Sequence, residues 1–237
     1  MEKYIDYLVT WIKKIVSDAN LNGVIVGVSG GIDSAVVSTL AQKAFPNNSL
    51  GVIMPITKMS DYEDAKLVTK TNDIKTLEVD LSKPFSNFKD ELGLKNNLAA
   101  ANIKPRLRMT TLYALAQENN YLVLGTDNAA EWVLGYFTKF GDGGADALPL
   151  IHLTKGEVRL MAKSLGVDNK IIEKPPTAAL WDGQTDEDEL GFSYDFVDKY
   201  IKGQEVPSDI KEKIEIQNKR TQHKREAAIC PQHPEKL

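Results

Sequence analysis

The sequence predicts an α/β fold in which a doubly wound, mostly parallel five-stranded sheet is covered by helices on both faces. Short β-branched segments alternate with segments of helical periodicity as far as residue 172, and this alternation is typical of parallel sheets with crossover helices. The chain of 237 residues is also long enough for one α/β domain with a helical extension. We therefore expect a single domain over 1–237, with a core at about 20–172, a mobile loop at about 175–191 and C-terminal helices at about 192–228.

The N-terminal segment predicts an amphipathic helix over residues 3–18. Apolar side chains such as Tyr4, Leu8 and Ile12 recur there at helical spacing. A helix of this kind packs against the core or a second subunit, or lies on a membrane surface. The polar face is not enriched in basic residues, which favours packing.

The predicted strands are short aliphatic runs bounded by turn residues, as expected for strands buried on both faces. We expect them in the order 3-2-1-4-5, in which the first and fourth strands are neighbours at the point where ligands bind in such sheets. Four of the strands are located by their composition, at Val24–Val28, Leu50–Met54, Ile74–Val79 and Tyr121–Leu124.

Periodicity and start signals locate the helices between the strands. Ser60 with Glu63, and Thr154 with Glu157, have the spacing of a capping box, in which two side chains satisfy N–H groups at a helix start. Gly166 is suited to end the second of these helices. We predict helices at residues 33–45, 60–72, 127–134, 154–164, 192–202 and 208–228, and a helical region interrupted at Pro84 and near Pro105.

Composition and charge exclude several classes of protein. Lysine and arginine number 29 against 33 aspartates and glutamates, giving a net charge of −4, which argues against a protein that mainly coats nucleic acid. The single cysteine, Cys230, cannot form a disulfide framework or a cysteine-based metal site. No segment approaches the ~20 apolar residues of a membrane span, and the N-terminus lacks the apolar core of a signal peptide. We expect a cytoplasmic protein without nucleic-acid or membrane partners.

A glycine-rich segment between the first strand and the next helix predicts a phosphate site. Glycines let the backbone approach an anion, while serine hydroxyls and free N–H groups at a helix start donate to it. The segment is neither a Walker A loop nor a GxGxxG motif, and its carboxylate, Asp33, would repel phosphate unless Mg²⁺ bridged the two. A glycine-rich turn with a helix-capping aspartate is the alternative. The predicted loop consists of Gly27, Val28, Ser29, Gly30, Gly31, Ile32, Asp33 and Ser34.

Two further segments carry polar side chains suited to a nucleotide or a polar substrate. After the fourth strand, Thr126 can hydrogen-bond a nucleotide, and Glu131 lies four residues after Asp127, on the same face of the predicted helix. If the first and fourth strands are neighbours, Asp33 and Glu131 face one Mg²⁺ and the phosphates that it bridges. The next segment, 135–146, combines lysine and aspartates with glycines, as in a polar substrate site, although it also fits a flexible surface loop.

Five motifs, in the same order along almost the whole chain, resemble the ammonia-dependent NAD synthetases of the N-type ATP pyrophosphatase superfamily. They are SGGIDS, GTDNAAE, GYFTKFGDGGAD, LTKGEVR and PTAALWDGQTDEDELG. The resemblance implies an adenine nucleotide alpha hydrolase-like fold, Mg²⁺ as cofactor and a homodimer. It also implies two steps: the carboxylate of deamido-NAD attacks the α-phosphate of ATP and releases pyrophosphate, and ammonia then displaces AMP to give NAD.

The resemblance implies roles for individual residues. Asp142 would orient ammonia or take its proton, Lys155 would act in catalysis, and Asp33 and Glu131 would bind Mg²⁺. Pro105 precedes Arg106 where the family usually has alanine. The implied ATP contacts are residues Gly27 to Ser34, Thr126, Lys155 and Thr177, and the implied deamido-NAD contacts are Arg106, Lys139, Asp146, His223 and Lys224.

Chain length, charge and residue types bear on the nitrogen source and on the competing functions. Family members that use glutamine carry a separate nitrilase-like domain, for which this length leaves no room. Free ammonia is therefore expected, unless another protein supplies it. A tRNA-thiolating or GMP-synthesising adenylating enzyme has the same phosphate loop, but thiolation favours a broad basic face and additional cysteines. A non-enzymatic nucleotide sensor would not need Asp33, Glu131, Lys139 and Lys155 together.

Overall fold

Four parallel strands form the sheet of the structure, a computed structural model that describes residues 1–57, 61–175 and 186–232. Their order, β3-β2-β1-β4, confirms the predicted neighbours. Val24 pairs with Ser49 on one side and with Leu122 on the other. The strands are β1 (Gly23–Gly27), β2 (Ser49–Ile53), β3 (Thr76–Glu78) and β4 (Tyr121–Leu124).

The expected fifth strand is reduced, among the described residues, to an isolated parallel bridge between Leu124 and Ala147. The N–H of Gly125 donates to the carbonyl of Ala147 at 2.8 Å, so the segment does lie along β4. Pro149 lacks the N–H that would continue the ladder. The Asp146 carboxylate also accepts the N–H of Val123 at 2.8 Å, which a fifth strand would otherwise use. The prediction of five strands is therefore corrected to four and a bridge.

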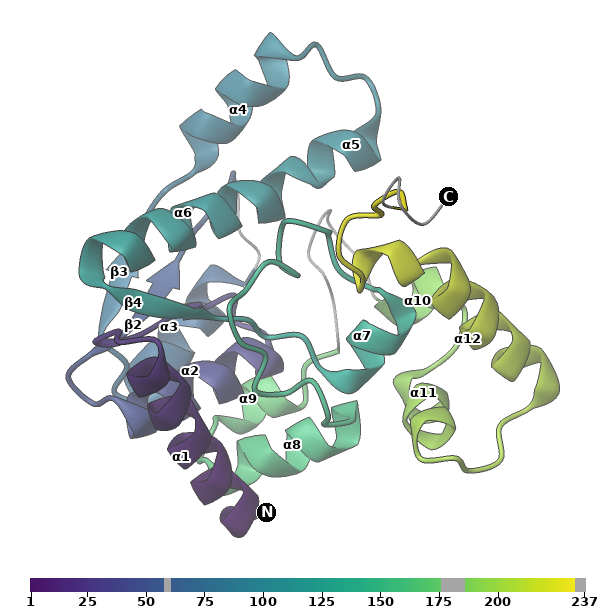
Figure 1. The fold of residues 1–237 in the computed structure, drawn as a ribbon, viewed down its shortest axis with the longest axis horizontal. Helices are drawn as coiled ribbons and strands as arrows, with labels where there is room; N and C mark the ends of the chain where they lie inside the picture. Colours follow the sequence, from purple (N-terminus) through teal and green to yellow (C-terminus); the bar gives the residue numbers. More distant parts are fainter. Residues whose placement is uncertain (58–60, 176–185, 233–237) are drawn as a thin grey trace.

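Helices cover both faces of the sheet, and the two faces are built from alternate residues of the strands (Figure 1). Val24 and Val26 pack in the larger core cluster, whereas Ile25 packs in the cluster on the other face, as the two-residue period of a strand requires. The first face carries α1 (Glu2–Asp18), α2 (Ile32–Ala44), α3 (Tyr62–Thr71), α8 (Lys155–Ser164) and α9 (Asn169–Ile172). The second carries α4 (Ser82–Glu91) and α6 (Ile103–Asn119), and α5 (Asn97–Ala101) packs against α6.

A third cluster joins the C-terminal extension to the helix that follows β4. Its buried residues include Leu134, Tyr194 and Ile214. The last carbonyls of a helix have no partner within the helix, and here Thr221 donates to the carbonyl of Leu134 at 3.0 Å. The elements joined in this way are α7 (Ala129–Leu134), α10 (Asp186–Leu190), α11 (Tyr194–Ile201), α12 (Ser208–Arg220) and the 3₁₀ helix η1 (Gln222–Lys224).

The helix boundaries confirm some of the local predictions. Thr154 and Glu157 form the predicted capping box of α8, and Gly166, with φ of 74°, follows the end of that helix. Ser60, the first residue of the other predicted box, lies outside the described residues. None of the helices formed by the described residues is long and apolar enough to cross a membrane.

Other boundaries differ from prediction for local reasons. The helix predicted from Asp127 begins at Ala129, because Asn128 caps it and forms a capping box with Glu131. Asp127 therefore does not share a helix face with Glu131. Residues 186–190, predicted as loop, form α10, and α12 ends at Arg220 instead of continuing to Ala228.

Candidate active site

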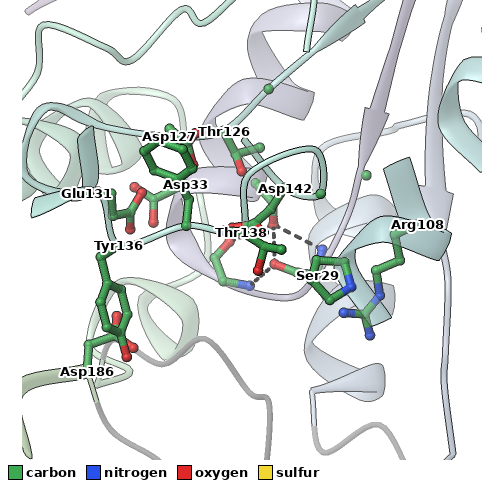
Figure 2. A pocket seen from close by; sticks show the side chains of 18 of the residues that line it. Ser29, Asp33, Arg108, Thr126, Asp127, Glu131, Tyr136, Thr138, Asp142 and Asp186 are labelled. Carbon is green, nitrogen blue, oxygen red and sulfur yellow. Dashed lines mark hydrogen bonds between the residues drawn. The ribbon is translucent and has the colours of Figure 1, made fainter. Parts of the chain in front are cut away.

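A cavity of about 1140 Å³ opens at the carboxyl ends of β1 and β4, where ligands bind in open parallel sheets. The loops after these strands form its floor, and residues of α6, α12 and η1 form its walls. Figure 2 shows Asp33 and Glu131 near one end of this view and Arg108 near the other, with Ser29 and Asp142 between them. The cavity therefore combines acidic, hydroxyl and cationic groups.

The predicted phosphate loop lies in the cavity floor and is closed by its own hydroxyls. The two hydroxyl oxygens of Ser29 and Ser34 are 3.1 Å apart, and the N–H of Gly31 donates to Ser29 Oγ at 3.2 Å. No side chain among the described residues caps the start of α2, which makes its N–H groups available to an anion. All the predicted loop residues except Gly30 line the cavity.

Gly30 has a packing role in this loop. Its φ is 84°, and a Cβ there would lie 2.6 Å from the carbonyl oxygen of Asp61 and 2.9 Å from the backbone nitrogen of Ala65. Because only glycine tolerates both the backbone conformation and the contact, Gly30 lets the loop pack against the start of α3.

Lys155 joins the two acidic residues predicted to share a cation. Its Nζ lies 2.6 Å from Asp33 Oδ2 and 3.1 Å from Glu131 Oε1. Asn128 Nδ2 donates to Asp33 Oδ1 at 2.9 Å. The structure thus brings Asp33, Glu131 and Lys155 together, although they come from three different segments of the chain.

Burial sets the protonation of this group. Burial of the Glu131 carboxyl and the charge of nearby Asp33 raise the pKa of Glu131 to about 7, although the Lys155 ammonium acts to lower it. Lys155 is only 2% exposed. Burial alone would lower the pKa of Lys155, but the two carboxylates reverse that effect and raise the pKa, so the ammonium stays charged.

The glycine-rich segment after α7 places Asp142 on the cavity wall. Its Oδ1 accepts the N–H of Thr138 at 3.0 Å, which fixes the carboxylate, and the enclosure of the group raises the pKa of Asp142. Asp127, which is buried, also lines the cavity. Among the described residues, its Oδ2 has no hydrogen-bond partner. Burial and the charges of Asp142, Glu131 and Asp33 raise the pKa of Asp127.

Three of the predicted dinucleotide residues lie together near the cavity. Arg106 donates to the carbonyl of Lys139 at 3.4 Å, and Lys139 Nζ donates to the carbonyl of His223. Only His223 of the three lines the cavity. Lys224 lines it too, and its Nζ donates to the carbonyls of Gly135 at 2.7 Å and Phe137 at 2.6 Å.

Asp146 is not part of this assembly. Asp146 accepts a hydrogen bond from the Tyr113 hydroxyl at 2.9 Å and lines a separate pocket with Tyr113 and Tyr121. Thr177 lies outside the described residues. Thr126 lines the main cavity as predicted.

Sequence reasoning missed several residues of the cavity. Arg108, rather than Arg106, lines it, and its Nε donates to the carbonyl of Met54 at 3.2 Å. Asn128 does not line the cavity but donates to Asp33, and it was missed although Asn-x-x-Glu is a capping-box signal. Tyr136 also lines the cavity and donates to Glu189 at 2.7 Å, and no local pattern in the sequence indicates that contact.

The acidic residues fit a shared cation only if a ligand completes its coordination. Within the parts of the chain that the structure describes, no three His, Cys, Asp or Glu side chains are grouped to hold a metal. Asp33 and Glu131 nevertheless converge on one cation, the ammonium of Lys155. Two carboxylates together with substrate phosphates are the ligand set that Mg²⁺ commonly uses.

Comparisons with known proteins agree on one family. The family described as NAD synthase matches residues 4–228. The chain is 52% identical to the NH(3)-dependent NAD(+) synthetase of Mycoplasmopsis pulmonis, covering 98% of this chain and 91% of the relative. It is 50% identical to the enzyme of the same description from Mesoplasma florum, over 98% and 97% of the two chains. Among solved structures, an NMN synthetase from Francisella tularensis superimposes with a TM-score of 0.93 at 38% identity, over 98% of both chains.

Proposed function

The chain belongs to the NAD synthase family, and from this premise we propose that its cavity amidates deamido-NAD with ammonia at the expense of ATP, as an ammonia-dependent NAD synthetase. The products are NAD, AMP and pyrophosphate. The observation that carries the proposal is the convergence of the phosphate loop, the Asp33–Lys155–Glu131 group and Asp142 on one cavity. Each part answers a need of the reaction.

ATP binds across the phosphate loop in this proposal. The free N–H groups at the start of α2 and the hydroxyls of Ser29 and Ser34 donate to its phosphates. Asp33 and Glu131 are the residues that would hold Mg²⁺, and the ion would supply positive charge to offset the phosphates. Thr126 contacts the nucleotide from the adjacent strand end, and Thr177 remains an ATP contact by resemblance.

The first step makes the carboxylate reactive. An oxygen of the deamido-NAD carboxylate attacks the α-phosphorus of ATP, and the bond from that phosphorus to the bridging oxygen breaks, releasing pyrophosphate. Lys155 stabilises the charge that develops on the phosphates, because its ammonium is buried beside the loop and remains protonated. Arg108, on the opposite wall, adds a second cation.

The second step replaces AMP with nitrogen. Ammonia attacks the carbonyl carbon of the adenylated carboxylate, and the bond to the AMP oxygen breaks. Asp142 accepts a proton from the nitrogen, which is reasonable because its raised pKa makes it a stronger base than an ordinary aspartate. Thr138 holds the Asp142 carboxylate in place through its backbone N–H.

Deamido-NAD extends from this centre toward the C-terminal segment. Lys139, Arg106 and His223 lie in contact there, and Lys224 holds the carbonyls of 135 and 137 while lining the cavity. Asp146 lies in the separate pocket on α6. It would therefore contact a part of deamido-NAD that extends out of the main cavity.

The assembly is proposed to be a homodimer in the cytoplasm, with α1 at the interface. Support comes from Tyr7, an exposed ring that stacks on Tyr4 at 5.6 Å between ring centroids. Sedimentation equilibrium tests this directly. We expect the mass of two chains, and the mass of one chain at micromolar concentration contradicts it.

An end-product assay tests the proposed function. The purified protein receives Mg²⁺, ATP and deamido-NAD, with ammonium in one arm and glutamine in the other, while NAD and pyrophosphate are quantified. Because one solved relative is an NMN synthetase, nicotinate mononucleotide replaces deamido-NAD in a third arm. We expect NAD with ammonium, little with glutamine, and a lower kcat/KM for the mononucleotide. Pyrophosphate release that ignores the dinucleotide would indicate a different adenylating enzyme, and no release would indicate a sensor.

A further inference from the structure

We propose that Lys155 is an exchangeable counter-ion of the metal site: without nucleotide its ammonium occupies the position between Asp33 and Glu131, and the site accepts a divalent cation only together with ATP. This inference rests on the proposed function, in which Asp33 and Glu131 are the metal ligands. It adds a binding order, with free metal excluded and the metal–nucleotide complex admitted.

The carboxylates of Asp33 and Glu131 are already engaged in hydrogen bonds. Asp33 Oδ2 and Glu131 Oε1 both accept from Lys155 Nζ, at 2.6 and 3.1 Å. Asp33 Oδ1 accepts from Asn128 Nδ2 at 2.9 Å, and Glu131 Oε2 accepts from the backbone N–H of Asn128 at 3.2 Å. All four oxygens therefore have a donor, and the two that face each other share the ammonium. A metal ion can join both carboxylates only after Lys155 moves.

The surroundings of Lys155 explain why it does not yield to a free metal ion. The ammonium is buried, lies 5.4 Å from the centre of the Tyr194 ring, and is held by both carboxylates. Free Mg²⁺ would have to displace this ammonium and gain only two carboxylates, since no third acidic or histidine ligand is grouped with them in the described chain. Mg²⁺ gives up its water reluctantly and favours sites that add substrate phosphates.

Nucleotide binding changes this balance. The phosphates bring oxygen ligands for the metal and, at the same time, a new anionic partner for Lys155. Lys155 is the first residue of α8 and lines the cavity in which the phosphates bind. One ammonium cannot offset both carboxylates and a triphosphate, so the bound nucleotide needs additional positive charge. The exchange leaves no charged group in the site without a partner.

The experiment measures Mn²⁺ binding by electron paramagnetic resonance, with and without ATP. The variants are Lys155→Met, which removes the ammonium, Glu131→Gln, which removes one ligand, and Lys202→Met as a matched control. Lys202 pairs with a single carboxylate, Glu157, at 3.2 Å on the surface. Without ATP, we expect Lys155→Met to bind Mn²⁺ at least about tenfold more tightly than the wild type, and Lys202→Met to behave as the wild type.

Thermal unfolding supplies a second readout that does not depend on turnover. Lys155→Met leaves two partly buried carboxylates without their cation, so its Tm should fall by about 10 °C. Millimolar Mn²⁺ should restore most of the loss while leaving the wild-type Tm unchanged. If Lys155→Met fails to fold, Lys155→Gln, whose amide still donates to one carboxylate, is measured in the same way.

The outcomes distinguish a failure of the counter-ion exchange from a failure of the proposed function. Tight Mn²⁺ binding by the wild type without ATP, or no gain in the Lys155 variants, overturns the counter-ion exchange. If Glu131→Gln leaves Mn²⁺ binding in the presence of ATP unchanged, the assignment of the metal ligands fails as well. If that variant weakens Mn·ATP binding while the Lys155 variants gain nothing, only the exchange is wrong.

Discussion

Lys155 contacts both acidic side chains of the site. Kinetics of a variant that still folds separate the role of Lys155 in turnover from its role in packing. Lys155→Ala should lower kcat on the order of 10²–10³-fold, as does the loss of other donors that stabilise a transition state. Steady-state kinetics at saturating ATP and deamido-NAD measure the effect, with circular dichroism to confirm that the variant is folded. A loss of less than threefold would show that the ammonium only fills space.

Asp142 has the geometry for handling nitrogen, because its carboxylate faces the cavity and is fixed by the N–H of Thr138. Asp142→Asn keeps an oxygen for that N–H but removes the base, so kcat should fall by about 10²-fold or more and the KM for ammonium should rise. The KM for ATP is the internal control and should change by less than about twofold. An equal rise in both KM values would assign Asp142 to the general shape of the cavity.

At this scale, the sequence predicted Asp33 and Glu131 from their places after two strands, but it did not predict which arginine of α6 enters the cavity. Asp33 and Glu131 follow β1 and β4, and the carboxyl ends of neighbouring parallel strands must meet. Arg106 and Arg108 are two positions apart on α6, which rotates their side chains by about 200° relative to each other. Which of them enters the cavity depends on the face that α6 packs against the sheet, and the low amphipathicity of α6 hides that face.

Among the elements, α8 is the one whose start matters most to the site, and a side chain of α11 fixes it. The Asp198 carboxylate accepts the N–H groups of Lys155 at 3.0 Å and Gly156 at 2.8 Å. Asp198→Ala should lower the free energy of unfolding by about 1–2 kcal/mol, the usual effect of losing a helix cap. Urea unfolding measures it, with the exposed Asp195→Ala as control, and equal effects of the two substitutions would count against the cap.

A second contact between elements joins α3 to α9 and to the segment that follows α9, and it predicts a pH dependence. Burial of Asp64 tends to raise its pKa, but the hydrogen bonds from Lys170 and Lys174 outweigh this and lower it. A lowered pKa in the folded state means that the ionised form adds stability above the unfolded pKa of about 3.9, and that this stability is lost as the pH falls through the folded value.

Asp64→Asn should therefore be less stable than the wild type at pH 7, and the difference should shrink as the pH falls below about 4. Urea unfolding at pH 7 and at pH 3 measures both differences. Asp90→Asn, at an exposed position of α4, should show little difference at either pH. A difference for Asp64→Asn that is the same at both pH values would contradict the ion pairing.

Element boundaries followed local signals where the chain supplied complete ones. Thr154 and Glu157 were recognised as a capping box and form one. Asn128 and Glu131 carry the same signal, but the prediction did not use it. The helix was therefore predicted to begin at Asp127, two residues before the actual start of α7. The fifth strand could not be judged from local pattern, because it depends on which N–H groups of β4 the Asp146 side chain occupies.

For the whole molecule, the alternation of strands and helices was sufficient to predict a parallel sheet with two covered faces. Val24 and Val26 of β1 pack on one face and Ile25 packs on the other. The arrangement of the C-terminal extension was not predictable. Thr221 and Arg225 donate to carbonyls at the end of α7, and these contacts join residues about ninety positions apart that share no local pattern. They bring His223 and Lys224 to the cavity wall.

The central claim is that this cavity activates a carboxylate by joining it to the α-phosphate of ATP. Deamido-NAD labelled with ¹⁸O in both oxygens of its nicotinate carboxylate tests the claim most directly, with mass spectrometry of the AMP and NAD formed from ATP and ammonium. The account predicts one ¹⁸O in each AMP and one in the amide of each NAD. Unlabelled AMP, or ADP in place of AMP, would contradict it.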